Sequence, residues 1–247
     1  MRFRSKLRGS GSQSTPLAGL EESKVLVAIA GADGAGKTTL SRQVEQALLH
    51  MGVEAVRLDR FDILNPTLSP ASAFIDTDVQ TLRNSVLQMP TATARLLFML
   101  WSMAVTVSSH LDQADASRVI IYDSYWMKHT AAEIIFGADE KAALATASLL
   151  PQPDITLYIK LRPEEMYRRK HDDLVAYECG MDPACHPESF LQHQRRILER
   201  LDSWSQRLGW QEIDGTQSLD ALVAELVRRI GEARATWKCG EPATLAL

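Results

Sequence analysis

Residues 27–39 read VAIAGADGAGKTT, an apolar run that leads directly into the pattern G-x-x-x-x-G-K-T. β-Branched residues precede the glycines and a helix-like run from 40 to 49 follows them, which is the context that a phosphate-binding loop requires. Gly31, Gly34 and Gly36 can adopt backbone angles closed to other residues, so successive N–H groups can turn around phosphate oxygens at the mouth of the helix. This stretch therefore predicts a binding site for a nucleoside triphosphate.

The side chains of this loop have expected roles in binding MgATP. Lys37 is expected to reach the β- and γ-phosphates, and the Thr38 hydroxyl to help hold a magnesium ion that binds the same phosphates. ATP and Mg²⁺ are therefore the expected cofactors. The nucleotide-binding residues expected in the loop are Gly31, Gly34, Ala35, Gly36, Lys37, Thr38 and Thr39.

Strand-like and helix-like segments alternate along residues 24–235. This alternation predicts a single α/β domain, with a five-stranded parallel sheet covered by helices on both faces. Sheets of this kind bind ligands beyond the carboxyl ends of their strands, so the loops after the first four strands should line one cleft. The expected strands cover residues 24–30, 53–59, 118–123, 154–160 and 210–214.

The third expected strand is apolar and ends in a carboxylate, Asp123. An acid at this place, opposite the phosphate loop, can orient magnesium. Asp59, at the end of the second expected strand, is a weaker competitor for the same role. A strand-ending aspartate can also simply cap the next turn, and that alternative stays open for Asp123.

The overall composition favours a soluble enzyme. The 247 residues are 45% hydrophobic, which is enough to bury a substantial core. A formal net charge of −4 argues against broad nucleic-acid binding, because a duplex binder needs a basic face. Three scattered cysteines indicate a reducing compartment and hence the cytoplasm. Charges or prolines interrupt the apolar stretches short of the roughly 20 residues of a membrane helix, so no membrane span is expected.

The two ends of the chain differ from the centre. Residues 1–23 hold four basic residues and no acid before Glu21, which predicts a disordered basic tail. An organelle transit peptide is the alternative, although the apolar spacing fits it poorly. Residues 236–247 are expected to form a loose C-terminal extension.

Several further segments follow one another in a set order. They are Arg95-Leu96-Leu97-Phe98, Asp123-Ser124-Tyr125, residues 153–160 followed by Pro163-Glu164-Glu165, and residues 213–217. Together with Asp33 inside the phosphate loop, this order makes residues 24–231 resemble the thymidylate kinase-like family of P-loop nucleoside monophosphate kinases.

The resemblance implies a P-loop kinase fold with a helical lid at about residues 163–190. It also implies transfer of the γ-phosphoryl group of MgATP to a small-molecule acceptor, a nucleoside monophosphate of the dTMP type. Family members commonly form homodimers through helices beside the sheet, a role that an apolar helix over residues 94–107 would suit. The acceptor-binding residues implied are Asp33, Arg60, Phe61, Arg95, Phe98 and Tyr125, and those near the donor adenine are Gly215 and Thr216.

The implied acceptor residues have distinct roles. Phe98 corresponds to the phenylalanine that stacks on the acceptor base, and the pair Arg60-Phe61 looks like the family pair whose arginine contacts the acceptor phosphate. A solvated loop charge is the alternative for Arg60. Arg95, one helical turn before Phe98, is a replacement candidate for a missing phosphate-binding cation.

The chain departs from the family at two acceptor positions. Ser124 follows Asp123 where the family has an arginine, and Ser102 stands where the family has an arginine that recognises the acceptor nucleotide. A phosphate carries nearly two charges and is usually held by a bidentate guanidinium, so losing both arginines should weaken or relocate its binding. The identity of the acceptor therefore stays open.

The expected lid carries the run Arg168-Arg169-Lys170-His171. A cation that arrives on lid closure stabilises the charge of phosphoryl transfer and excludes water. Arg168 or Arg169 is expected to be catalytic, together with Lys37, Asp33 and Asp123. A solvated helix face is the alternative for the basic run.

Two other functions stay open. A P-loop kinase that phosphorylates a hydroxyl of a non-nucleotide metabolite would explain the missing arginines and would use Asp33 as a general base. An ATP-binding regulatory protein without transfer activity would keep the phosphate loop only. A zinc site is not expected, because the spacing of Cys179, Cys185, His186 and His193 matches no common structural pattern.

Overall fold

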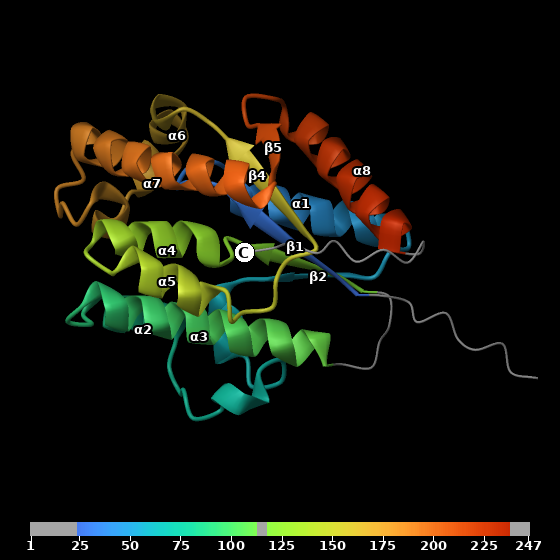
Figure 1. Ribbon diagram of the computed structural model, residues 1–247, viewed down its shortest axis with the longest axis horizontal. Coiled ribbons are helices and arrows are strands. Elements are labelled where there is room, and N and C mark those ends of the chain that lie inside the picture. The colour runs from blue at the N-terminus through green and yellow to red at the C-terminus, as the bar shows by residue number, and fades with distance from the viewer. Residues whose placement is uncertain (1–23, 113–117, 238–247) are drawn as a thin grey trace, which may run out of the picture.

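The computed structural model describes residues 24–112 and 118–237 (Figure 1). The expected N-terminal tail, residues 1–23, lies outside the described residues, and so does the C-terminal extension from residue 238 on. The last described helix runs through Trp237, two residues past the expected end of the domain.

Five parallel strands form one sheet in the order β2-β3-β1-β4-β5. Every residue of β1 and β3 is buried, so helices must cover both faces of the sheet at its centre. The prediction of an α/β fold with a five-stranded parallel sheet is confirmed. The strands are β1 (Val25–Ala30), β2 (Ala55–Leu58), β3 (Val119–Asp123), β4 (Ile155–Lys160) and β5 (Gln211–Asp214). Strand β2 is three residues shorter than expected, and each of the others is one residue shorter.

The described chain also has eight α-helices and four short 3₁₀ helices (Figure 1). The α-helices are α1 (Lys37–His50), α2 (Val79–Leu87), α3 (Ala92–Leu111), α4 (Trp126–Ile135), α5 (Glu140–Ala147), α6 (Pro163–Lys170), α7 (Pro187–Leu208) and α8 (Leu219–Trp237). The 3₁₀ helices are η1 (Arg60–Leu64), η2 (Pro70–Ser72), η3 (His171–Asp173) and η4 (Ala176–Cys179).

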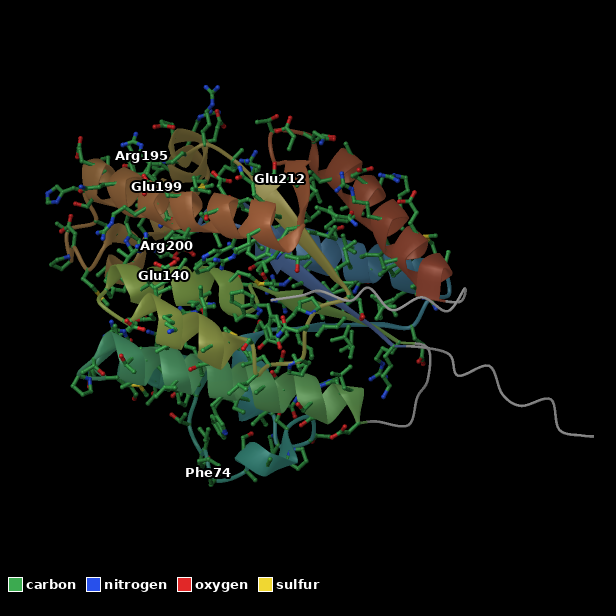
Figure 2. All side chains as sticks on the ribbon, in the orientation of Figure 1. Phe74, Glu140, Arg195, Glu199, Arg200 and Glu212 are labelled. Carbon is green, nitrogen blue, oxygen red and sulfur yellow. The ribbon has the colours of Figure 1, made fainter. Side chains whose placement is uncertain are left out.

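The longest helix, α7, shows how the helices attach to the core. Phe190, Ile197 and Trp204 are buried at helical spacing, so one face of α7 is apolar. Charged side chains such as Arg195 and Glu199 lie along the helix away from that face (Figure 2). The apolar face packs against α4, α6 and η4.

Helix α3 corrects one expectation from the sequence. Among the described residues it is the one helix long and apolar enough to cross a membrane, judged by length and composition alone. The prediction that every apolar stretch is too short was therefore wrong for residues 92–111. Half of the apolar window is buried against the rest of the chain, and α3 packs on α4, α5 and η1.

We expect Ile29→Ala to destabilise the fold strongly. Ile29 is fully buried in the central strand, between Asp123 of β3 and Leu157 of β4, and truncating it leaves a cavity that costs about 3 kcal/mol of unfolding free energy. Leu149→Ala is the control, because Leu149 is 82% exposed and should change stability by less than about 0.5 kcal/mol. Chemical denaturation measures both, and similar losses would contradict the assignment of the core.

Candidate functional site

The loop predicted to bind phosphate, residues 31–36, connects β1 to α1 at the carboxyl edge of the sheet; we keep the name phosphate loop for it. Gly34 and Gly36 have φ values of 85° and 86°, which side chains rarely adopt. A Cβ at Gly34 would lie 2.7 Å from the carbonyl oxygen of Met166, so the backbone of α6 rests directly on the loop. The glycine at this position serves close packing as well as the turn.

Lys37 is buried at the start of α1. Its Nζ donates a hydrogen bond of 2.6 Å to the carbonyl oxygen of Ala32 in the same loop. Burial lowers the pKa of Lys37 to about 8, although Asp33 opposes the shift. A buried ammonium group at the mouth of a helix is suited to an anionic ligand.

Asp33 is the centre of a buried network. Its Oδ1 accepts a hydrogen bond of 3.0 Å from Lys128 of α4, and its backbone N–H donates to Gln194 of α7 over 3.0 Å. Burial favours a raised pKa for Asp33, but the charges of Lys128, Lys37 and Lys170 hold it well below the usual range. The carboxylate is thus ionised, and its buried Oδ2 has no hydrogen-bond partner within the described chain.

Asp123 ends β3 beside the phosphate loop and shares a charge network with β2. Arg57 contacts its Oδ2 at 2.8 Å and also contacts Asp59 at 3.0 Å. The buried Oδ1 of Asp123 has no partner among the described residues. This free carboxylate oxygen and the exposed Thr38 hydroxyl are hard oxygen donors of the kind that magnesium prefers, so the residues fit the metal.

Asp59, the competitor of Asp123 for the magnesium role, caps a 3₁₀ helix in the structure. Its side chain accepts the backbone N–H of Phe61, and its own backbone N–H donates to the side chain of Asp62. This reciprocal capping box starts η1. It therefore fixes Arg60 and Phe61 at the edge of the cleft.

A pocket of about 170 Å³ adjoins the phosphate loop; we call it the Arg60 pocket. Its wall includes Lys128, the partner of Asp33, and so connects it to the loop. Three of the predicted acceptor residues, and Ser102, meet there although they come from η1 and α3. The lining residues are Arg60, Phe61, Leu82, Arg83, Val86, Leu87, Phe98, Met99, Ser102, Lys128, Glu133, Lys170, Asp173, Val175, Tyr177 and Glu178.

Arg60 has a cationic group without a carboxylate partner in the part of the chain that the structure describes. One guanidinium nitrogen lies 3.2 Å from the sulfur of Met99, a weak acceptor, and the group lies 4.7 Å from the centre of the Phe61 ring. Burial lowers the pKa of Arg60, and the nearby charge of Arg83 acts in the same direction. Arg60 lines the pocket, so its charge is available to an anion that binds there.

Three predicted acceptor residues do not line this pocket: Asp33, which is joined to it through Lys128, and Arg95 and Tyr125. Arg95 forms an ion pair of 2.9 Å with the buried Glu133 and also donates to the carbonyl oxygen of Met89, so its guanidinium is already engaged. Tyr125 is fully buried; its ring packs on Tyr122 and its hydroxyl donates to the carbonyl oxygen of Pro151. Neither residue lines the Arg60 pocket.

The two candidate lid arginines differ in position. Arg168 is 70% exposed and pairs with Glu165 on its own helix. Arg169 donates a hydrogen bond of 2.9 Å to the carbonyl oxygen of Gly215, and one of its nitrogens lies 3.9 Å from the place of a Cβ at Gly36. The structure thus brings Arg169, and not Arg168, beside the phosphate loop.

The segment after β5 lies against the same edge of the sheet. A Cβ at Gly215 would lie 2.8 Å from the side chain of Ile159, so only glycine fits without a shift of β4. Thr216 is exposed, and both its backbone N–H and its hydroxyl donate to Asp214. Arg169 connects this segment to the phosphate loop through Gly215.

Sequence reasoning missed several residues of the site, namely Arg83, Lys128, Glu133, Tyr177, Glu178 and Gln194. Lys128 had a usable signal, because it lies five residues after Asp123, on the first turns of the helix that leaves the same edge of the sheet. The others come from segments without a motif. Lys170 was noted only as part of the basic run, and the structure pairs it with Glu178.

A second pocket, of about 460 Å³, lies at the opposite edge of the sheet. The amino ends of β4 and β5 contribute Ile155 and Gln211 to it, and α4 contributes Trp126.

No group of three or more metal-ligating side chains occurs within residues 24–112 and 118–237. Comparison of the sequence with protein-family models and with curated proteins gave no match.

We expect Gly34→Ala to lower the melting temperature more than Gly52→Ala does. Both glycines have a positive φ, 85° and 73°, but nothing lies within 4 Å of a Cβ at Gly52, whereas one at Gly34 would collide with Met166. The Gly52 variant carries only the cost of a side chain at positive φ, so the difference between the two variants measures the cost of the collision with Met166. Equal losses in thermal unfolding would show that α6 does not rest on the loop.

The buried charge of Lys37 should make stability depend on pH. The folded pKa of about 8 lies below the ordinary 10.5, so a protonated Lys37 destabilises the fold below pH 8 and this cost fades as pH rises toward 10.5. Lys37→Met should therefore be more stable than the native chain at about pH 7, and the difference should shrink toward about pH 10. Urea unfolding of both proteins measures it, and a difference independent of pH would contradict the burial of the charge.

Proposed function

We propose that the protein is a P-loop kinase that transfers the γ-phosphoryl group of MgATP to a small acceptor bearing a phosphate, with a nucleoside monophosphate of the dTMP type as the leading candidate. One observation carries the proposal. A phosphate loop with a buried lysine adjoins a pocket whose Arg60 has no carboxylate partner within the described residues, and the ion pair of Lys128 with Asp33 joins the two.

The arrangement of the sheet supports a P-loop kinase fold. The phosphate loop follows the central strand β1, between β3 and β4, and Asp123 ends the neighbouring strand. Helix α6 packs its backbone on the loop and places Arg169 beside Gly36. A helix that touches the phosphate loop and carries cations matches the role of a lid.

The side chains divide the work of phosphoryl transfer. Lys37 and Arg169 neutralise charge on the donor phosphates, and Thr38 and Asp123 would hold magnesium, which would supply Lewis-acid stabilisation of the phosphate charge. An acceptor oxygen attacks the γ-phosphorus while the bond to the bridging oxygen breaks and ADP leaves. Closure of α6 over the loop excludes water, which would otherwise take the phosphoryl group.

The state of Asp33 favours an acceptor that is already anionic. A general base works best with a pKa near the working pH, but nearby cations hold the pKa of Asp33 well below its usual range. A phosphate acceptor needs no base. Asp33 then serves to hold Lys128 at the junction of the loop and the Arg60 pocket, and this supports the phosphate acceptor over a hydroxyl acceptor.

The test is ADP release with MgATP and a panel of nucleoside monophosphates, phosphorylated metabolites and a no-acceptor control. We expect acceptor-dependent turnover, with Lys37→Ala lowering it by orders of magnitude while the melting temperature stays within a few degrees. Lys141→Ala is the control, since Lys141 is exposed on α5. Tight MgATP binding without turnover on any acceptor would favour a regulatory ATP-binding protein and refute the proposal.

A further inference from the structure

We propose that Arg83 of α2 is a second acceptor-binding cation, which together with Arg60 binds the phosphate monoester end of the acceptor. This inference deepens the proposed function and rests on it. It assigns a specificity-determining residue to a helix that carries no motif. It also explains how the chain can hold a phosphate with serines at positions 102 and 124.

The geometry places both guanidinium groups on one aromatic ring at the Arg60 pocket. The central carbon of Arg60 lies 4.7 Å and that of Arg83 lies 5.3 Å from the centre of the Phe61 ring. All three residues line the pocket. Contact with the ring fixes the position of each cation but leaves its N–H groups available for a ligand.

The charges of Arg60 and Arg83 favour the binding of an anion between them. Arg83 is partly buried and has no ion pair or hydrogen bond to a side chain or carbonyl within residues 24–112 and 118–237, and Arg60 bonds only to the sulfur of Met99. The charge of Arg83 disfavours the charged form of Arg60, so the two groups repel each other across the ring. A dianionic phosphate relieves this repulsion, and its oxygens can accept hydrogen bonds from both guanidinium groups.

The fold holds the two cations in place independently of a ligand. The capping box of Asp59 and Asp62 starts η1 at Arg60, and Asp78 caps α2 by accepting the backbone N–H groups of Gln80 and Thr81. A small apolar cluster of Ile63, Leu82 and Val86 then packs η1 against α2, with Phe61 at its edge. The pair is therefore preorganised, which lowers the cost of binding.

The other cations of the pocket, and Ser102, are not available to bind an anion in this way. Lys128 is paired with Asp33 and Lys170 with Glu178, so their charges are already balanced. Ser102 is buried, and its hydroxyl donates to the carbonyl oxygen of Met99. Among the described residues that line the pocket, Arg60 and Arg83 are the cations without a carboxylate partner.

The experiment measures acceptor binding separately from turnover. Isothermal titration calorimetry with the nucleotide site filled by the magnesium complex of a non-hydrolysable ATP analogue compares each nucleoside monophosphate with its unphosphorylated nucleoside. The proteins are the native chain, Arg83→Gln, Arg83→Lys and the control Arg207→Gln, whose side chain is exposed at the opposite edge of the sheet. Steady-state kinetics follow for every acceptor that binds.

We expect Arg83→Gln to weaken monophosphate binding by about tenfold or more, to raise KM to match and to leave kcat within about threefold. Arg83→Lys should recover part of the affinity, because it restores the charge without the fork. Binding of the ATP analogue and of the unphosphorylated nucleosides should not change. Arg207→Gln should behave as the native chain does.

The outcomes separate this inference from the proposed function. Unchanged monophosphate affinity in Arg83→Gln, or a native chain that binds no monophosphate in preference to its nucleoside, overturns the role of Arg83. Binding that depends on Arg83 without any turnover supports the anion site and refutes the kinase. Binding and turnover that both depend on Arg83 support the two together.

Discussion

The buried ion pair between Asp33 and Lys128 is the contact on which the arrangement of the site depends. Taking two charges out of water is costly unless they are paired and further hydrogen-bonded. The pair joins the phosphate loop to α4, and Gln194 of α7 adds a hydrogen bond to the backbone of Asp33. Removal of Asp33 would leave Lys128 buried without its carboxylate partner, and removal of Lys128 would leave Asp33 only the charges of Lys37 and Lys170. These contacts therefore hold the loop, α4 and α7 together.

Some charged residues near the Arg60 pocket are paired with an opposite charge in the fold, and others are not. Arg95 of α3 and Glu133 of α4 form an internally balanced pair, which holds the two helices together. Arg60 has no such partner within the described chain, and its pKa is lowered by burial. A fold that keeps an unbalanced cation accepts a cost in stability, which is the usual sign of a residue reserved for a ligand.

Features that depend on neighbouring residues along the chain could be predicted from the sequence. Contacts between segments far apart in the chain could not. Strands such as β1 and β3 are continuous apolar runs, and the phosphate loop is a local pattern, so both could be located. Arg95 looked like a free cation because Glu133, which pairs with it, lies 38 residues further on. No local pattern marks Arg83, because its place at the pocket depends on the packing of α2 against η1.

The proposed acceptor site has serines at two positions where the resembling family has arginines, and the same reasoning explains how it can still bind a phosphate. A phosphate is recognised by the number and geometry of the cations around it, and these can come from any element that reaches the pocket. Ser102 lines the Arg60 pocket and Ser124 follows β3, whereas Arg60 and Arg83 approach from η1 and α2. In our proposal, Arg60 and Arg83 supply from another side of the pocket the positive charge that the resembling family has at position 102, which changes the direction from which an acceptor is held.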